Sequence, residues 1–81
     1  MDDRYKNIGT VPTRTVEECS ELIKAICKAD RFGWENYIPG TNQRNLERVK
    51  DELHDVMYRC KELEDHIGMM EEMIWKLEKH E

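Results

Sequence analysis

A long, regular apolar seam runs through the second half of the chain. From Leu46 to Leu77, apolar residues recur at alternating intervals of three and four positions, the heptad spacing of helices that pack lengthwise against other helices. The seam comprises Leu46, Val49, Leu53, Val56, Cys60, Leu63, Ile67, Met70, Ile74 and Leu77. A β-strand repeats its side chains with a period of two, so the seam predicts an all-α fold.

A shorter helix is predicted ahead of the seam. Thr15 and Glu18 fit a capping box at a helix N-terminus, and an apolar stripe with helical spacing then continues as far as Cys27. Gly33 predicts that this helix ends near Phe32, because glycine commonly follows the last helical turn. The capping box therefore places the helix start near Thr15.

The segment 33–41 is predicted to be a loop with Pro39-Gly40 as its turn. A second helix is expected to begin near Asn42. Gly68 falls inside the seam, and glycine costs about 1 kcal/mol relative to alanine within a helix. The seam can therefore form one long helix or two, and we expect a break or kink near residues 66–68.

A chain of 81 residues has room for one domain but buries too little surface to be stable without further support. We assign residues 1–13 to an N-terminal arm and residues 14–81 to a single helical domain. The three cysteines, Cys19, Cys27 and Cys60, occupy apolar helical positions, and we expect reduced, buried thiols rather than disulfides. The prediction is an antiparallel helical bundle completed by oligomerisation, as a dimer or tetramer.

Charge and hydropathy narrow the possible partners. The net charge is −5 and the sequence has no long basic run, which argues against binding to a nucleic acid duplex. No segment approaches the roughly 18–20 apolar residues that cross a bilayer, and the N-terminal residues lack the apolar stretch of a signal peptide. We therefore expect a cytoplasmic protein that does not bind membranes.

Two acidic pairs are the strongest candidates for chemistry. Glu18 and Glu21 are three positions apart in the first predicted helix, and Glu52 and Asp55 are three apart in the second. Residues at this spacing share a helix face, so two packed helices can bring four carboxylates together. Such hard oxygen ligands suit Mg²⁺ or Mn²⁺ rather than zinc. Pairs of this kind also occur on solvated helix faces without any metal, and spacing alone leaves both interpretations open.

Two motifs resemble one enzyme family. Glu17–Ile26, EECSELIKAI, resembles the EE-x-x-EL-x-x-A helix of the MazG-like nucleoside triphosphate pyrophosphohydrolases, and Lys50–Val56, KDELHDV, resembles their second acidic motif. Asn45-Leu46 is similar to the NL that often precedes that motif. The resemblance covers residues 15–65 and implies Mg²⁺-dependent hydrolysis of nucleoside triphosphates to a monophosphate and pyrophosphate. It implies that Glu18, Glu21, Glu52 and Asp55 hold the metal.

Other residues are candidates for substrate contacts. We expect Glu21 to orient or deprotonate the attacking water. Lys24, Lys28 and Arg31 follow on the same helix and are candidates to bind phosphates, although they also complement the helix dipole. Trp34 and Tyr37 can stack on a base or pack over the core.

Two other functions compete with the enzyme. The seam is compatible with a non-catalytic coiled-coil or helical oligomerisation module, in which Met69, Met70, Met73 and Trp75 form an oligomer contact. A MazG-like fold with a degenerate site that only binds nucleotides or another protein is the second alternative.

Overall fold

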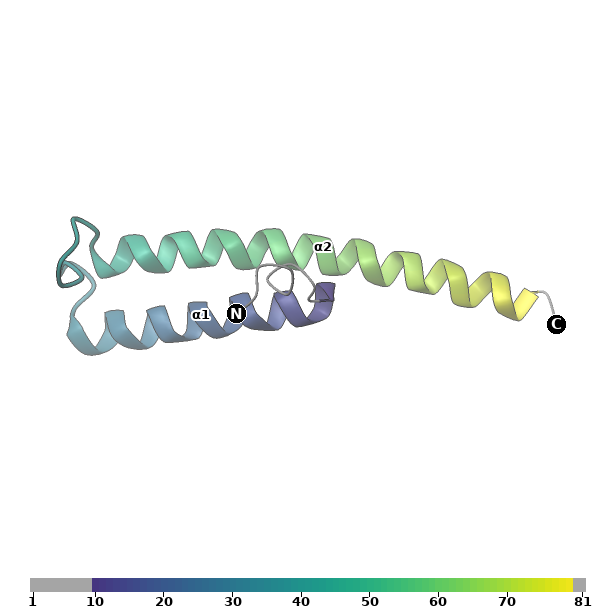
Figure 1. The fold of residues 1–81 in the computed structure, drawn as a ribbon, viewed down its shortest axis with the longest axis horizontal. Helices are drawn as coiled ribbons and strands as arrows, with labels where there is room; N and C mark the ends of the chain where they lie inside the picture. The colour runs from purple at the N-terminus through teal and green to yellow at the C-terminus, as the bar shows by residue number, and fades with distance from the viewer. Residues whose placement is uncertain (1–9, 80–81) are drawn as a thin grey trace, which may run out of the picture.

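The chain forms an antiparallel helical hairpin. A computed structural model describes residues 10–79, which form α1 (Val11–Phe32) and α2 (Asn45–Lys79), joined by the loop 33–44 (Figure 1). The all-α prediction is confirmed for the described residues. With 35 residues against 22, α2 extends well beyond the N-terminal end of α1. Within the described range, neither helix is both long and apolar enough to cross a membrane.

Helix α1 begins at Val11, so the predicted start near Thr15 is wrong. Thr10 is the N-cap, and its hydroxyl oxygen accepts the backbone N–H of Thr13 at 3.3 Å. Pro12 lies in the first turn, where its missing N–H leaves no hydrogen bond unmade. Residues 11–13 of the predicted arm therefore belong to α1, and residues 1–9 lie outside the described part of the chain.

Thr15 is buried and contacts the other helix. Its hydroxyl lies 2.9 Å from the carbonyl oxygen of Val11 and 3.3 Å from that of Arg59 on α2. One hydroxyl proton is therefore shared between an acceptor within α1 and an acceptor on α2. The residue that suggested a helix cap instead sets the alignment of the two helices.

The predicted end of α1 is confirmed. Gly33 follows Phe32 with a φ of 99°, a conformation that residues with a side chain rarely adopt. Its backbone N–H donates to the carbonyl oxygen of Ala29 at 2.9 Å and so closes the last turn.

The loop between the helices contains the predicted turn. Gly40 has a φ of 77°, and the backbone N–H of Thr41 donates to the carbonyl oxygen of Ile38 at 3.0 Å. The loop continues to Arg44, so α2 begins three residues after the predicted Asn42. Within the loop, Tyr37 and Arg44 form an isolated antiparallel bridge.

Helix α2 runs without interruption through Gly68, and the predicted break is wrong. A Cβ built on Gly68 would meet nothing within 4 Å, so no close packing requires glycine there. The neighbouring residues are mostly Met, Glu and Ile, and Met and Glu are strong helix formers. Their preferences offset the local penalty of about 1 kcal/mol for one glycine.

Small side chains form the contact between the helices. Among the described residues, Ala29 is fully buried and Ala25 is 7% exposed, and no large side chain is completely buried. Val49 and Val56 of the seam are half-buried, whereas Leu46 and Leu53 are exposed. The hairpin thus covers only one side of the seam, and completion of a bundle by further chains stays a prediction.

The cysteines form no disulfide, but their expected burial is mostly wrong. Cys19 is half-buried, whereas Cys27 and Cys60 are exposed free thiols. The apolar stripes that contain them are wider than the contact between the two helices. Positions of each stripe outside that contact, Cys27 and Cys60 among them, therefore stay open to solvent.

Candidate metal centre and adjoining cleft

Three of the four predicted acidic residues meet across the two helices. Glu18 of α1 and Glu52 and Asp55 of α2 each offer a carboxylate oxygen, and these oxygens all lie within 4.8 Å of one another. Glu18 and Glu52 are half-buried, and Asp55 is exposed. The cluster thus combines one carboxylate from the first motif with both carboxylates from the second.

The environment of Glu52 disfavours its negative charge. Burial raises the pKa of the Glu52 carboxyl, and the charges of Asp55 and Glu18 raise it further. The charge of Arg48 lowers this pKa, and the charge of Glu21 raises it by a smaller amount. A cation placed among these carboxylates would relieve the repulsion between them.

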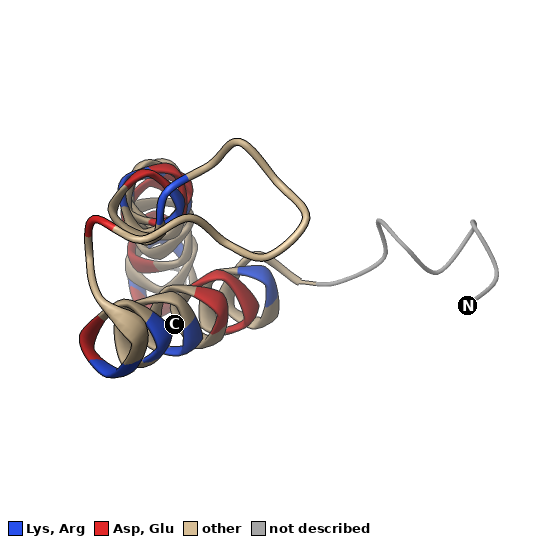
Figure 2. Cartoon of the chain, turned by 90° about the vertical axis from the view of Figure 1, so that its left-hand side faces the viewer, with Lys and Arg blue, Asp and Glu red and all other residues tan. Residues whose placement is uncertain are grey.

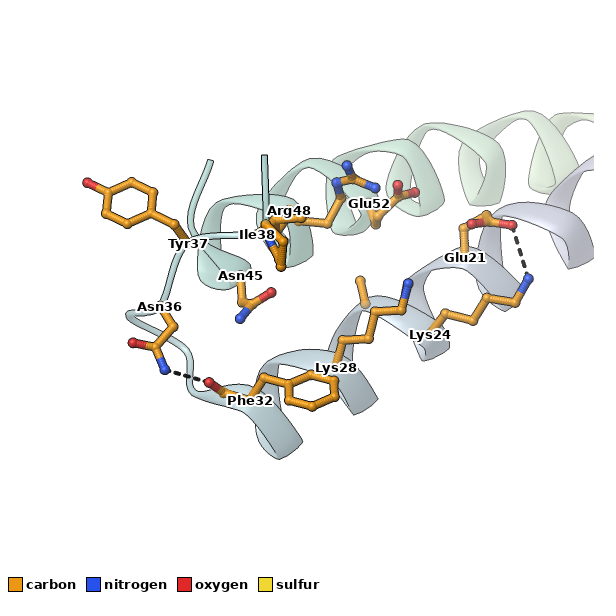
Figure 3. Close-up of a pocket in the computed structure, with 12 residues that line it drawn as sticks. Glu21, Lys24, Lys28, Phe32, Asn36, Tyr37, Ile38, Asn45, Arg48 and Glu52 are labelled. Atoms are coloured by element: carbon orange, nitrogen blue, oxygen red, sulfur yellow. Dashed lines mark hydrogen bonds and ion pairs between the residues drawn. The ribbon is translucent and has the colours of Figure 1, made fainter. Parts of the chain in front are cut away.

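Glu21 lies beside this cluster rather than within it. Its carboxylate is 3.5 Å from the ammonium nitrogen of Lys24, one turn further along α1, as Figure 3 shows. Both side chains are more than half exposed, so this ion pair is weak in water. Glu21 is therefore free to face a ligand that enters the space between the helices.

A cleft of about 590 Å³ adjoins the carboxylates. It lies between α1, the loop and the first turns of α2, and Glu21 and Glu52 line one end of it. Its basic side chains are Lys24 and Lys28 from α1 and Arg48 from α2. Ligand sites commonly measure about 300–1,000 Å³, so the cleft can hold a ligand the size of a nucleotide.

The end of the cleft nearer the loop is less charged. Phe32, Ile38 and Pro39 supply apolar surface there, beside the amides of Asn36 and Asn45. The Asn36 amide donates to the carbonyl oxygen of Phe32 at 2.6 Å, and the Asn45 amide donates to that of Gly33 at 2.8 Å. These bonds fix the wall of the cleft to the end of α1.

Tyr37 also borders the cleft, but its ring points outward from the loop (Figure 3). The guanidinium of Arg44 lies over this ring, 5.1 Å from its centre, and donates to the phenol oxygen at 3.4 Å. The arginine thus covers one face of the ring and leaves the other for a ligand.

Two predicted contact residues lie outside the cleft. Arg31 is not part of the lining, and its guanidinium sits 6.0 Å from the centre of the Phe32 ring. Trp34 does not line it either, and its backbone carbonyl accepts the N–H of Leu46 at 3.0 Å. Neither residue is therefore placed to contact a ligand within the cleft.

Sequence reasoning missed Arg48, the one basic residue that α2 contributes to the lining. Its position was informative, because Arg48 precedes Glu52 by four residues and so shares a helix face with it. Acidic and basic residues are interspersed on both helices (Figure 2), and many such pairs are equally plausible from the sequence. Only the packing of α1 distinguishes this pair from the others.

The donor set fits a hard divalent cation. The cluster contains carboxylates and no histidine or cysteine, so it could bind a cation that prefers oxygen ligands.

Comparison with known proteins adds no relative: the chain matches no protein-family model, no curated protein and no solved structure.

Proposed function

We propose that this protein is a Mg²⁺-dependent nucleoside triphosphate pyrophosphohydrolase. The observation that carries the proposal is the meeting of Glu18, Glu52 and Asp55 beside a cleft that also contains basic side chains. A triphosphate needs both features, because cations neutralise its charge and carboxylates hold the metal that it binds. The two acidic motifs that resemble the MazG-like family supply these same carboxylates.

The basic residues account for substrate binding. Lys24, Lys28 and Arg48 lie along the cleft and would bind the phosphate oxygens through charge-assisted hydrogen bonds. Glu18, Glu52 and Asp55 would hold Mg²⁺ or Mn²⁺, which neutralises phosphate charge and polarises a phosphoryl oxygen when bound. Without a cation, the carboxylates would repel the triphosphate.

Glu21 is the proposed general base. Its exposed carboxylate borders both the cleft and Glu52, where it would accept a proton from the attacking water. The water oxygen forms a bond to the α-phosphorus as the bond from that phosphorus to the bridging oxygen breaks. The bridging oxygen leaves with the electron pair on pyrophosphate, and the other product is a nucleoside monophosphate.

The aromatic side chains near the loop would receive the base. Phe32 lines the cleft at this end, and stacking on its ring would contribute about 1–3 kcal/mol for any base. Tyr37 borders the cleft with its ring turned outward, so it would contact only a base that reaches the rim. Trp34 lies outside the lining, so it is the weaker candidate of the two aromatic residues singled out from the sequence.

The decisive experiment follows an oxygen isotope. The purified chain is incubated with each ribo- and deoxyribonucleoside triphosphate and Mg²⁺ in ¹⁸O-labelled water. The products are then separated, and mass spectrometry determines which of them carries the label. We expect monophosphate and pyrophosphate, with the label only in the monophosphate. Label in pyrophosphate, or release of inorganic phosphate and a diphosphate, would contradict attack on the α-phosphorus.

The same experiment, combined with equilibrium dialysis, distinguishes the alternatives. A module that only forms coiled coils would neither turn over nor bind any triphosphate. A degenerate binding protein would retain a nucleotide in equilibrium dialysis with Mg²⁺ but release no pyrophosphate. Glu52→Gln serves as the inactive control, because it removes one carboxylate of the cluster and keeps the side-chain shape.

A further inference from the structure

Within the described residues 10–79, no other helix packs against the C-terminal part of α2. Thr15, near the start of α1, already contacts Arg59, so residues 63–79, here called the α2 arm, extend past the end of α1 (Figure 1). Large apolar side chains are exposed along the arm: Ile67 at 42%, Met70 at 41%, Ile74 at 54% and Leu77 at 70%. A soluble helix normally covers such a stripe with another helix.

The type of residue at each seam position indicates what covers it. In heptad notation, Ile67 and Ile74 occupy a positions, and Leu63, Met70 and Leu77 occupy d positions. Among parallel coiled coils, β-branched residues at a with leucine at d favour two strands. The arm has this pattern, with one methionine replacing a leucine.

The charges beside the seam favour a parallel orientation. All three e positions of the arm are glutamates: Glu64, Glu71 and Glu78. In a parallel pair, each e position faces a g position of the other helix. Glu64 would face Arg59, which also pairs with Glu62 of its own helix at 2.6 Å. Glu71 would face His66, and Glu78 would face the uncharged Met73. An antiparallel pair would instead set glutamates of the two arms against one another, and like charges repel.

We propose that the α2 arms of two copies of this chain form a parallel two-stranded coiled coil. Both hairpins then lie at the same end of the dimer. The proposal rests on the arm and does not depend on the proposed enzymatic function.

The rest of the hairpin is compatible with this dimer. Ile23 and Ile26 of α1 are exposed, and each is two positions from a residue that lines the cleft, Glu21 and Lys24 respectively. Two positions correspond to about 200° around a helix, so these isoleucines lie on the side of α1 opposite the cleft. Together with exposed Leu53 of α2, they can face the second copy while both clefts stay open.

Two adjacent methionines provide a matched test of the interface. Met70 occupies a d position, whereas Met69 occupies an outer c position and is 63% exposed. Sedimentation equilibrium of the full chain should give twice the chain mass of 9.8 kDa. Met70→Glu should raise the dimer dissociation constant by about 100-fold or more, and Met69→Glu, which adds the same charge, should leave it unchanged. Circular dichroism checks that both variants remain helical.

Cysteine cross-linking tests the orientation. In a chain whose natural cysteines are replaced by alanine, Ile74→Cys should form a symmetrical disulfide under mild oxidation, because a parallel pair places each Ile74 beside its counterpart. An antiparallel pair would instead place Ile74 of one copy opposite Met70 of the other. In that case Ile74→Cys chains would not cross-link with one another, and a disulfide would form only when Ile74→Cys and Met70→Cys chains are mixed. Glu72→Cys, on the outer face, is the control that should not cross-link. A monomeric wild-type chain, equal effects of the two methionine substitutions, or cross-linking only in the mixture would overturn the proposal.

Discussion

The hydroxyl of Thr15 on α1 lies 3.3 Å from the carbonyl oxygen of Arg59 on α2, and this contact explains where the acidic motifs meet. The helices are antiparallel (Figure 1), so one turn forward from Thr15 reaches Glu18, and one turn back from Arg59 reaches Asp55. Glu18 and Asp55 therefore lie at the same level of the hairpin. A slip of one turn between the helices would separate the carboxylates of the two motifs.

Replacing a carboxylate of the cluster by its neutral isostere should lower the activity without lowering the stability of the fold. Glu52→Gln or Asp55→Asn should lower kcat by about 100-fold or more, a typical effect of losing a group that stabilises transition-state charge. The fold should be as stable as wild type or more so, because burial and neighbouring charges already raise the pKa of Glu52. Pyrophosphate release and thermal melts measure the two effects. Asp65→Asn, on the exposed α2 surface, is the control, and full activity in both cluster variants would exclude these residues as metal ligands.

Two basic residues of α1 should differ in their effect on substrate binding. Lys28 lines the cleft, and Arg31 does not. Losing one charge-assisted hydrogen bond to phosphate corresponds to about 1.5–3 kcal/mol, so Lys28→Gln should raise KM by about 10-fold or more. Arg31→Gln should leave KM within about twofold of wild type, since surface changes are usually within 0.5 kcal/mol. Steady-state kinetics on both variants test the position of the cleft, and equal effects would count against it.

Divalent cations should stabilise the protein in a manner that depends on pH. At ten times its dissociation constant, Mg²⁺ should add about 1.4 kcal/mol to the free energy of unfolding. The raised pKa of Glu52 means that protonation of this carboxyl favours the metal-free fold. The protonated Glu52 carboxyl therefore contributes to the free energy of unfolding at low pH, and this contribution is lost as the pH rises through the raised pKa. The Mg²⁺-induced rise in Tm should therefore be largest at neutral pH and shrink on acidification.

Melts with Mg²⁺ or EDTA across a pH series provide this measurement. Glu52→Gln is the matched control, because it removes the titrating group and should give a smaller Mg²⁺ effect with a weaker dependence on pH. Identical melting curves with Mg²⁺ and EDTA, with and without a nucleotide, would argue against the metal centre.

Enlarging a fully buried alanine between the helices should destabilise the hairpin. Ala29 is completely buried where α1 meets α2, so Ala29→Leu should lower the free energy of unfolding by about 1–3 kcal/mol through overpacking. Ser20→Leu, at an exposed position of the same helix, should change it by no more than about 0.5 kcal/mol. Urea denaturation compares the two. An unchanged midpoint for Ala29→Leu would mean that the helices do not approach closely at this residue.

The sequence predicted the helices better than their boundaries. The seam identified α2 and Gly33 marked the end of α1, because periodicity and a C-terminal glycine are local signals. Thr15 misled the prediction of the helix start, since a threonine that caps a helix and one that contacts a neighbouring helix look alike in sequence. Gly68 misled the prediction of a break, because its penalty is smaller than the combined preference of the surrounding residues for helix.

The candidate site was predicted in part for a similar reason. Spacing placed Glu52 and Asp55 on one face of a helix, and the resemblance paired them with Glu18 and Glu21. Which side chains line the cleft depends on how α1 and the loop pack against α2. The sequence therefore gave no reason to prefer Lys28 over Arg31, or to select Arg48.

The hydrogen bonds within the loop between the helices have a consequence for the order of folding. Its backbone pairs Ile38 with Gln43 and Asn36 with Asn45, contacts that are close in sequence and so lose little chain entropy on closure. Such local contacts are typical of chains that fold within microseconds to milliseconds. We expect the hairpin to nucleate at this loop and zip toward the α2 arm. Association of two copies would then be a later, bimolecular step whose rate rises with protein concentration.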